Sequence, residues 1–203
     1  MSLLAAGLSL CGTAQAAFES RLAGQAYYDS ALDITWLADA NTGAGSIFDD
    51  GSNTADGRMR WSSALDWAAS LTVGGSTAWR LPSMDRNGDS TIIDCAGASA
   101  AACADNEYGY HFYVSGIDST NSAPFSNVGT DNYWSATADG SNAWLFDFTF
   151  NDGSQLATSQ NFNALAWAVH DGDIALVPLP AAAWLLGSGL MGLLLGLRRH
   201  TAG

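Results

Sequence analysis

The end of the chain constrains its architecture more than any other feature. Ala181 to Leu197 is an apolar run without a charged residue, and Arg198, Arg199 and His200 follow it directly. About 18 uncharged residues are close to the minimum that spans a bilayer as an α-helix, and basic residues hold their end on the cytoplasmic side. The sequence therefore predicts one C-terminal transmembrane helix, with everything before it outside the cytoplasm.

A short proline motif stands directly before this run. Its residues are Val177, Pro178, Leu179, Pro180 and Ala181. A proline motif, one apolar helix and a basic end resemble the C-terminal sorting signals of bacterial PEP-CTERM proteins, in the variant called VPLPA-CTERM. The resemblance implies recognition by an exosortase, cleavage near the prolines, and delivery to the cell surface or an exopolysaccharide matrix. Residues 177–203 are therefore interpreted as a sorting signal, with an ordinary membrane anchor as the alternative.

The beginning of the chain also indicates export. Leu3 to Leu10 is apolar, and the small residues Ala14 and Ala16 stand where a signal peptidase reads its substrate. We expect residues 1–16 to be a signal peptide and residues 17–176 to form one domain outside the cytoplasm, which is long enough to bury a substantial core.

The charge of this domain is one-sided. It holds all twenty acidic residues of the chain against five arginines, and the chain has no lysine. Such a surface repels nucleic acid and other anionic polymers unless cations intervene. We therefore expect no nucleic-acid partner.

Two cysteines remain after the signal peptide, which contains Cys11, is removed. Cys95 and Cys103 form an even pair in an exported protein, where disulfides are stable. The sequence predicts a disulfide between them. Because the closed loop is short, the chain-entropy model gives about 2 to 3 kcal/mol, enough to fix a local loop but not the whole fold.

Local patterns predict several elements. Residues 27–37 are two β-prone runs around a turn, which is typical of a hairpin. Apolar residues at helical spacing predict a helix from Trp61 to Leu71 that ends at Gly74 and Gly75, and a weaker helix is expected over residues 106–114.

Residues 143–150 and 164–169 are apolar, aromatic and bounded by turns, as strands are. Most of the eight tryptophans should be core residues, and an exposed one could stack on a sugar.

Four motifs share one family resemblance. They are Trp79-Arg80-Leu81-Pro82-Ser83 after a helix, Tyr133-Trp134-Ser135, an aromatic strand from Trp144 to Phe148, and Ala166-Trp167-Ala168-Val169. Together they resemble the C-terminal domain of the Lcl collagen-like adhesin, which many exported bacterial proteins of unknown function also contain. The resemblance runs from about Tyr27 to Ile174 and implies a C-type lectin-like fold.

The expected fold class is therefore α+β: a small, irregular, mostly antiparallel sheet with two helices, plus the C-terminal transmembrane helix. One position departs from the family pattern, because His170 stands where the last strand usually continues into Arg. The resemblance therefore does not carry an ion pair of that Arg over to this chain.

Arg80 has two possible roles. It could face a ligand, or it could be buried against an Asp and backbone carbonyls and so hold the loop that leaves the helix. Because Pro82 fixes an extended backbone nearby, the structural role is favoured.

The best candidate for a metal site is the acidic stretch that begins at Asp85. Oxygen side chains at its first, third and fifth positions resemble the first half of an EF-hand or dockerin calcium loop. The position that should carry the last carboxylate is Ala96, so another acid would have to complete the shell. The predicted ligands are Asp85, Asn87, Asp89, Thr91 through its carbonyl, and Asp94. An acidic turn without a metal is the alternative.

Catalytic motifs are not evident in the domain. No Gly-x-Ser-x-Gly elbow and no closely spaced zinc ligands occur, and His111 and His170 are expected to be packed or exposed. The sequence thus favours a non-enzymatic surface or matrix protein that binds a polysaccharide, with calcium as a possible cofactor. A structural component of the envelope or biofilm is the first alternative, and a glycan hydrolase that uses a pair of Asp residues is the second.

Overall fold

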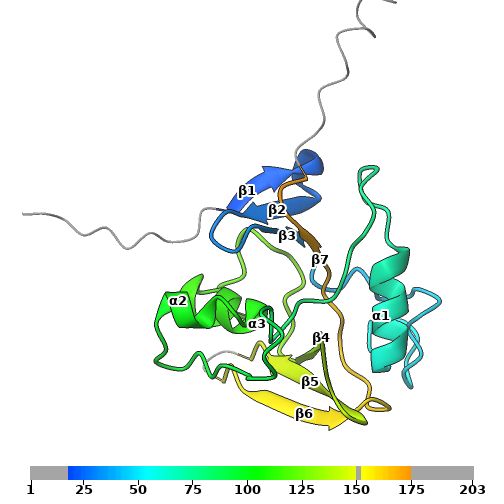
Figure 1. Ribbon diagram of the computed structural model, residues 1–203. Helices are drawn as coiled ribbons and strands as arrows, with labels where there is room; N and C mark the ends of the chain where they lie inside the picture. Colours follow the sequence, from blue (N-terminus) through cyan, green and yellow to red (C-terminus); the bar gives the residue numbers. More distant parts are fainter. Residues whose placement is uncertain (1–17, 150–151, 175–203) are drawn as a thin grey trace, which may run out of the picture.

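Two antiparallel sheets and a few short helices make up the part of the chain that the structure describes (Figure 1). The computed structural model describes residues 18–149 and 152–174. One sheet, ordered β1-β2-β3-β7, contains β1 (Phe18–Arg21), β2 (Ala26–Asp29), β3 (Ile34–Leu37) and β7 (Val169–Asp171). The other, ordered β4-β5-β6, contains β4 (Asn132–Asp139), β5 (Asn142–Asp147) and β6 (Gln155–Ser159). The helical segments are η1 (Leu22–Gly24), α1 (Trp61–Ser70), α2 (Ala100–Cys103), α3 (Glu107–Gly109) and the π-helical turn η2 (Tyr110–Val114).

The predicted hairpin at residues 27–37 is confirmed as β2 and β3. The two strands pair antiparallel, with Ala26 opposite Leu37. Their turn is fixed by Asp29, whose Oδ1 accepts hydrogen bonds from the backbone N–H groups of Ala31 and Leu32. A short carboxylate that caps its own turn is a common way to close a tight connection, so this hairpin is determined locally.

The predicted helix at Trp61 is confirmed as α1, but it ends earlier than expected. It buries Ala64, Trp67 and Ala68, and its backbone turns extended at Leu71. The two glycines that were expected to end the helix lie instead in the next turn, where the backbone groups of Val73 and Ser76 hydrogen-bond to each other. β-Branched residues follow Leu71, and they favour extended backbone over another helical turn.

The second sheet is a meander around the aromatic strand β5. The sequence predicted a strand over residues 143–150, whereas β5 ends at Asp147. The Asp147 carboxylate accepts a hydrogen bond from the Thr149 backbone N–H at 2.6 Å, which turns the chain away from the sheet. Strand β6 was not predicted, because its mixed sequence Gln155–Ser159 lacks the β-branched and aromatic pattern of a strand.

The segment at residues 164–169 joins the two sheets. It was predicted as a strand, but only Val169 belongs to one, the short β7. The earlier residues are extended and pair one at a time with different neighbours: the Ala164 carbonyl accepts from Met59, and the Leu165 carbonyl accepts from Trp134. The Ala168 carbonyl then accepts from Leu37 in the first sheet. A continuous strand is absent here because no single partner strand runs beside the segment.

A core of aromatic residues lies between these elements. Five of the seven tryptophans in the described residues are buried, and Trp61 and Trp144 are partly exposed. The ring of Trp167 packs against that of Trp36, and its Nε1 donates to the Leu37 carbonyl at 2.8 Å. The expectation that most tryptophans are core residues is therefore confirmed.

The fold class α+β with antiparallel strands is confirmed, whereas the single sheet is corrected to two. Each set of strands is closed largely by short local turns, so each can form its own sheet. The helix expected over residues 106–114 is present as α3 followed by η2, and α2 was not predicted. None of the helices within residues 18–149 and 152–174 has the length and apolar character needed to cross a membrane. The predicted signal peptide at 1–16, and the predicted sorting signal at 177–203 with its transmembrane helix, lie outside the described residues.

Candidate functional site

Arg80 connects the loop after α1 to the start of α3. Its Nη1 and Nη2 donate to the two carboxylate oxygens of Glu107 at 2.8 Å each, and Nη1 also donates to the Leu81 carbonyl. Its Nε donates to Asp171 at 3.0 Å. Burial alone would lower the pKa of Arg80, but the hydrogen bonds to both carboxylates outweigh it and raise the pKa. The predicted structural role of Arg80 is confirmed, with Glu107 as an additional partner.

Glu107 is the buried centre of this arrangement. Its side chain has no exposed surface, and it also accepts hydrogen bonds from the Ser83 backbone N–H at 2.7 Å and contacts Nε of Arg86 at 3.2 Å. A buried carboxylate is tolerated only when it is paired and hydrogen-bonded in this way. Sequence reasoning did not single out Glu107. Two features of the sequence could have pointed to it. Glu107 is one of only two glutamates among twenty acidic residues, and it stands at the start of an expected helix.

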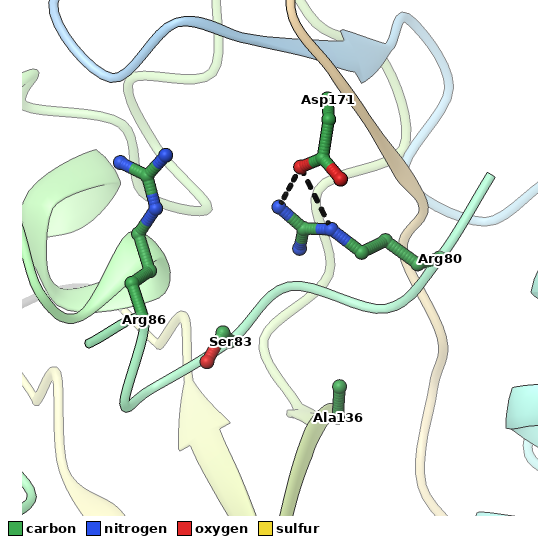
Figure 2. Close-up of a pocket in the computed structure, with 5 residues that line it drawn as sticks. All are labelled: Arg80, Ser83, Arg86, Ala136 and Asp171. Atoms are coloured by element: carbon green, nitrogen blue, oxygen red, sulfur yellow. Dashed lines mark hydrogen bonds and ion pairs between the residues drawn. The ribbon is translucent and has the colours of Figure 1, made fainter. Parts of the chain in front are cut away.

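A hollow of about 320 Å³ opens beside this ion-pair network. Figure 2 shows Arg80 directed toward Asp171 and Arg86 on the opposite side, with Ser83 between the two arginines and Ala136 below Arg80. The hydrogen bond from Arg80 lowers the pKa of Asp171, which stays ionised near neutral pH. The two arginines face two carboxylates, Asp171 and Glu107, so their charges balance and the hollow carries no large net charge.

The predicted calcium loop folds into a compact turn. The two oxygens of Asp85 accept from the backbone N–H groups of Asp89 and Ser90 at 3.1 and 3.0 Å. Asn87 Oδ1 accepts from the same Asp89 N–H at 2.8 Å. The Thr91 backbone N–H donates to Asp89 at 2.8 Å and lowers the pKa of that carboxyl. These contacts account for the spacing of the oxygen side chains without a metal.

An acid from further along the chain joins this turn. Carboxylate oxygens of Asp85, Asp89 and Asp105 all lie within 4.8 Å of one another. Asp105 Oδ1 also accepts from the Asn87 backbone N–H at 2.8 Å. We call Asp85, Asp89 and Asp105 the acidic triad. Sequence reasoning missed Asp105, because it reaches the turn only after the chain has reversed through the disulfide loop.

The disulfide that reverses the chain is confirmed. Cys95 and Cys103 are bonded, with their Cα atoms 5.3 Å apart. The short helix α2 lies within the loop, and the Ser99 side chain caps it by accepting from the Ala102 N–H. The bond therefore fixes the return of the chain from the predicted metal loop to Asp105.

Asp94, the fifth predicted calcium ligand, lies in a different hollow, of about 400 Å³. Its Oδ1 accepts from the Ala96 backbone N–H at 2.9 Å. We call this space the aromatic hollow. Its lining residues are Ile92, Asp94, Ala96, Tyr113, Trp144, Gly153, Ser154 and Gln155.

The walls of the aromatic hollow are held in place by partly buried hydrogen bonds. Gln155 accepts from Asn106 at 2.7 Å and donates to the Ile93 carbonyl at 3.0 Å. The Tyr113 hydroxyl donates to the Gly153 carbonyl at 3.2 Å, and burial followed by the charge of Asp94 raises the pKa of Tyr113. The hollow thus offers two aromatic rings and a carboxylate, with no basic side chain in its lining.

The two histidines of the described residues have different environments. His111 is fully buried and stacks on Trp36, with ring centroids 4.1 Å apart. His170 is partly exposed, and its Nδ1 lies 2.6 Å from the Asp171 carbonyl oxygen. His170 also packs edge-on against Trp79. The neighbouring Asp171 is paired with Arg80, so the first sheet keeps an ion pair at its end although His170 replaces the expected Arg.

These features define an α+β domain in which a buried Arg–Glu pair and one disulfide position two solvent-facing hollows. A family model, Lcl C-terminal domain, matches residues 25–170. The chain belongs to this family, and the resemblance inferred from its sequence motifs is confirmed over most of the expected range. No curated protein matches the chain.

Proposed function

We propose that this protein is a non-enzymatic surface or matrix protein whose domain binds a glycan in the aromatic hollow. The observation that carries the proposal is the lining of that hollow, where Tyr113 and Trp144 stand beside the carboxylate of Asp94 and the hydroxyl of Ser154. Binding sites for small polar ligands typically combine apolar and aromatic walls with a few placed polar groups. Aromatic faces pack against the C–H faces of sugar rings, while a carboxylate and a hydroxyl can bond to sugar hydroxyls.

The charge of the hollow favours a neutral sugar. Asp94 contributes a negative charge, the lining has no basic side chain, and the whole chain has a net charge of −13. An anionic sugar would be repelled at this place, whereas a neutral sugar would lose nothing. The proposed ligand is therefore a neutral part of an exopolysaccharide.

A C-type lectin-like fold is also part of what we propose for this domain. In support of it, short helices lie on either side of a small antiparallel sheet, as Figure 1 shows for α1 and α3 around β4 to β6. The fold by itself says little about the ligand, because one fold hosts many functions.

Localisation at the cell surface or in the extracellular matrix is also proposed. It is supported by the sequence of the two ends: residues 1–16 resemble a substrate of signal peptidase, and the Val177 to Ala181 motif resembles the sorting motif that an exosortase recognises. The apolar run behind that motif would hold the chain in the membrane until it is cut.

Calcium is proposed as a cofactor that stabilises the wall of the aromatic hollow. The acidic triad, with Asn87 and Thr91 beside it, offers the hard oxygen ligands that calcium prefers. The disulfide loop connects the triad to Asp94 and hence to the hollow. In this proposal calcium acts on binding indirectly, through the position of residues 92–96.

Retention on the exopolysaccharide of the native host tests the proposal. The purified protein should be retained saturably with millimolar calcium, and Trp144→Ala or Tyr113→Ala should weaken retention at least tenfold, since stacking on an aromatic ring is lost. Phe162→Ala is the matched control, because Phe162 is 45% exposed but does not line the hollow.

Chelation and Asp89→Asn form the calcium arm of the same experiment. Both should weaken retention if the triad binds calcium. Saturable retention that ignores Trp144 and Tyr113 would contradict the proposed site. No retention in any condition would favour the alternative, a structural envelope or biofilm component without a specific ligand.

A further inference from the structure

The loop between β3 and α1 buries a carboxylate that is only half satisfied. Asp49 is 3% exposed, and its Oδ2 accepts from the backbone N–H groups of Gly45 and Gly57 at 3.0 and 2.8 Å. Its Oδ1 has neither solvent contact nor a hydrogen-bond partner among the described residues. An unpaired buried carboxylate oxygen is costly, so this atom calls for a positively charged or hydrogen-donating partner.

A second buried oxygen in the same loop has the same deficit. Asn41 Oδ1 is buried without a hydrogen-bond partner among the described residues. Its orientation is fixed by the other end of the amide, because Nδ2 donates to the Asp56 carbonyl at 3.1 Å. Turning the amide over would direct Oδ1 at that carbonyl and lose the hydrogen bond.

Both side chains lie against Gly57. Asp49 binds its N–H group, and a Cβ atom added to Gly57 would lie 1.9 Å from Asn41 Oδ1. The backbone of Gly57 has a φ of 84°, which few residues other than glycine adopt. Glycine at this position thus allows an amide oxygen and a carboxylate to approach the same stretch of backbone.

The loop contains no positive charge that could serve Asp49. Residues 39–57 include four aspartates and no basic residue. The other three aspartates accept hydrogen bonds from Asn41, from Arg60 or from Arg58 through backbone N–H groups. The arginines that follow the loop are also engaged, Arg58 with Asp131 and Arg60 with Asp50. Among the residues that the structure describes, no basic side chain forms an ion pair with Asp49.

We propose that Asn41 Oδ1 and Asp49 Oδ1 are ligands of a calcium ion bound within this loop. A carboxylate and an amide oxygen, with backbone carbonyls and water to complete the shell, form the hard oxygen set that suits calcium and not zinc or copper. The site is separate from the acidic triad and does not depend on glycan binding. The ion would connect the start of the loop at Asn41 with its end at Gly57, and so hold the chain at the entry to α1.

Trp67 provides an optical probe for this site. A Cβ atom added to Gly43 would lie 3.5 Å from Cε2 of Trp67, so the loop packs directly on this buried indole. Terbium binds to oxygen ligands in calcium sites and emits when a nearby tryptophan transfers its excitation energy. A terbium ion bound by Asn41 and Asp49 should therefore emit when Trp67 is excited.

The test uses terbium titration followed by calcium competition, in a protein whose acidic triad is disabled by Asp89→Asn. This variant should still bind one terbium ion saturably, with emission that excess calcium abolishes. Adding Asp49→Asn should weaken terbium binding at least tenfold. Adding Asp56→Asn, which makes the same charge change in the same loop, should leave the affinity within twofold.

A second variant covers the case in which Asp49→Asn does not fold. Trp67→Phe in the Asp89→Asn background should reduce terbium emission severalfold while calorimetry still detects calcium binding. The proposal is overturned if no saturable ion binds, if Asp49→Asn binds as tightly as its control, or if emission is independent of Trp67.

Discussion

At the scale of single residues, His111 shows how strongly burial can act on a titratable group. Both of its ring nitrogens are buried without a hydrogen-bond partner among the described residues. Aromatic rings surround it, including Trp36, Phe18 and Phe125. Desolvation lowers the pKa of His111 to about 3, so the ring stays neutral in the folded protein. The side chain acts as an aromatic packing residue, and its unpaired polar atoms destabilise the folded state.

This cost predicts a pH dependence of stability. The unfolded chain binds a proton at His111 below pH 6.5, whereas the folded chain does not until about pH 3. Protonation of His111 therefore does not reduce the free energy of unfolding above pH 6.5. Below that pH it lowers the free energy of unfolding by about 1.4 kcal/mol per pH unit, down to about pH 3.

His111→Phe should remove this contribution and raise the free energy of unfolding at pH 7 by on the order of 1 kcal/mol, because no buried polar atom is left unpaired. Urea unfolding of both proteins at pH 7 and pH 5 measures the difference. The prediction would be contradicted if both proteins lost the same amount of stability between pH 7 and pH 5. Carboxylate titration is common to both proteins and cancels in the comparison.

At the scale of elements, one ion-pair network fastens the short helix α3 to the loop that follows α1. Glu107 at the start of α3 contacts Arg80, Arg86 and the Ser83 backbone, and Arg80 also reaches Asp171 in β7. A helix of three residues has little stability of its own. Its position depends on the network and on Asn106, whose side chain caps it by accepting from the Gly109 N–H.

Removing the central charge of this network should be costly. Glu107→Gln leaves Arg80 with Asp171 as its one carboxylate partner and removes the partner of Arg86, and we expect a loss of about 3 to 5 kcal/mol in the free energy of unfolding. Glu19→Gln is the control, because Glu19 is exposed and pairs with Arg21 at the surface, where an ion pair contributes about 1 kcal/mol or less. Chemical denaturation of both variants measures the difference. Similar losses in the two would show that the buried network has no special weight.

At the scale of the whole molecule, the segment at residues 164–169 makes one core out of two sheets. Its backbone bonds reach Met59, Trp134, Leu37 and Arg80 in turn. Trp167 packs at the centre, against Trp36 of the first sheet and Phe148 after the second. Because Trp167 contacts aromatic rings from both parts of the core, the two sheets should unfold together.

The whole chain also carries a prediction about processing. The intact mass of the protein isolated from its native host should lack residues 1–16 and everything from near the Val177 to Ala181 motif onward, because both ends resemble sequences that are removed during export. A product that retains Arg198 and Arg199 would refute the sorting prediction and indicate a plain membrane anchor. Replacing Pro178 and Pro180 by Ala should leave the tail uncut and provides the control.

The sequence by itself determined the features that depend on neighbours in the chain. The β2–β3 hairpin follows from β-prone runs and the turn at Asp29, and α1 follows from apolar residues at helical spacing. The disulfide follows from an even pair of cysteines in a chain whose sequence predicts export. The family resemblance also came from short motifs and is matched over residues 25–170.

The tertiary structure decided everything that joins distant parts of the chain. Only the fold shows that Glu107 is the partner of Arg80, that Asp105 completes the acidic triad, and that Asp94 lies in the aromatic hollow. The division into two sheets, and the shortening of the last strand to Val169–Asp171, have the same cause. Local patterns record which backbone a segment prefers, whereas contacts between distant segments depend on how all of them share one core.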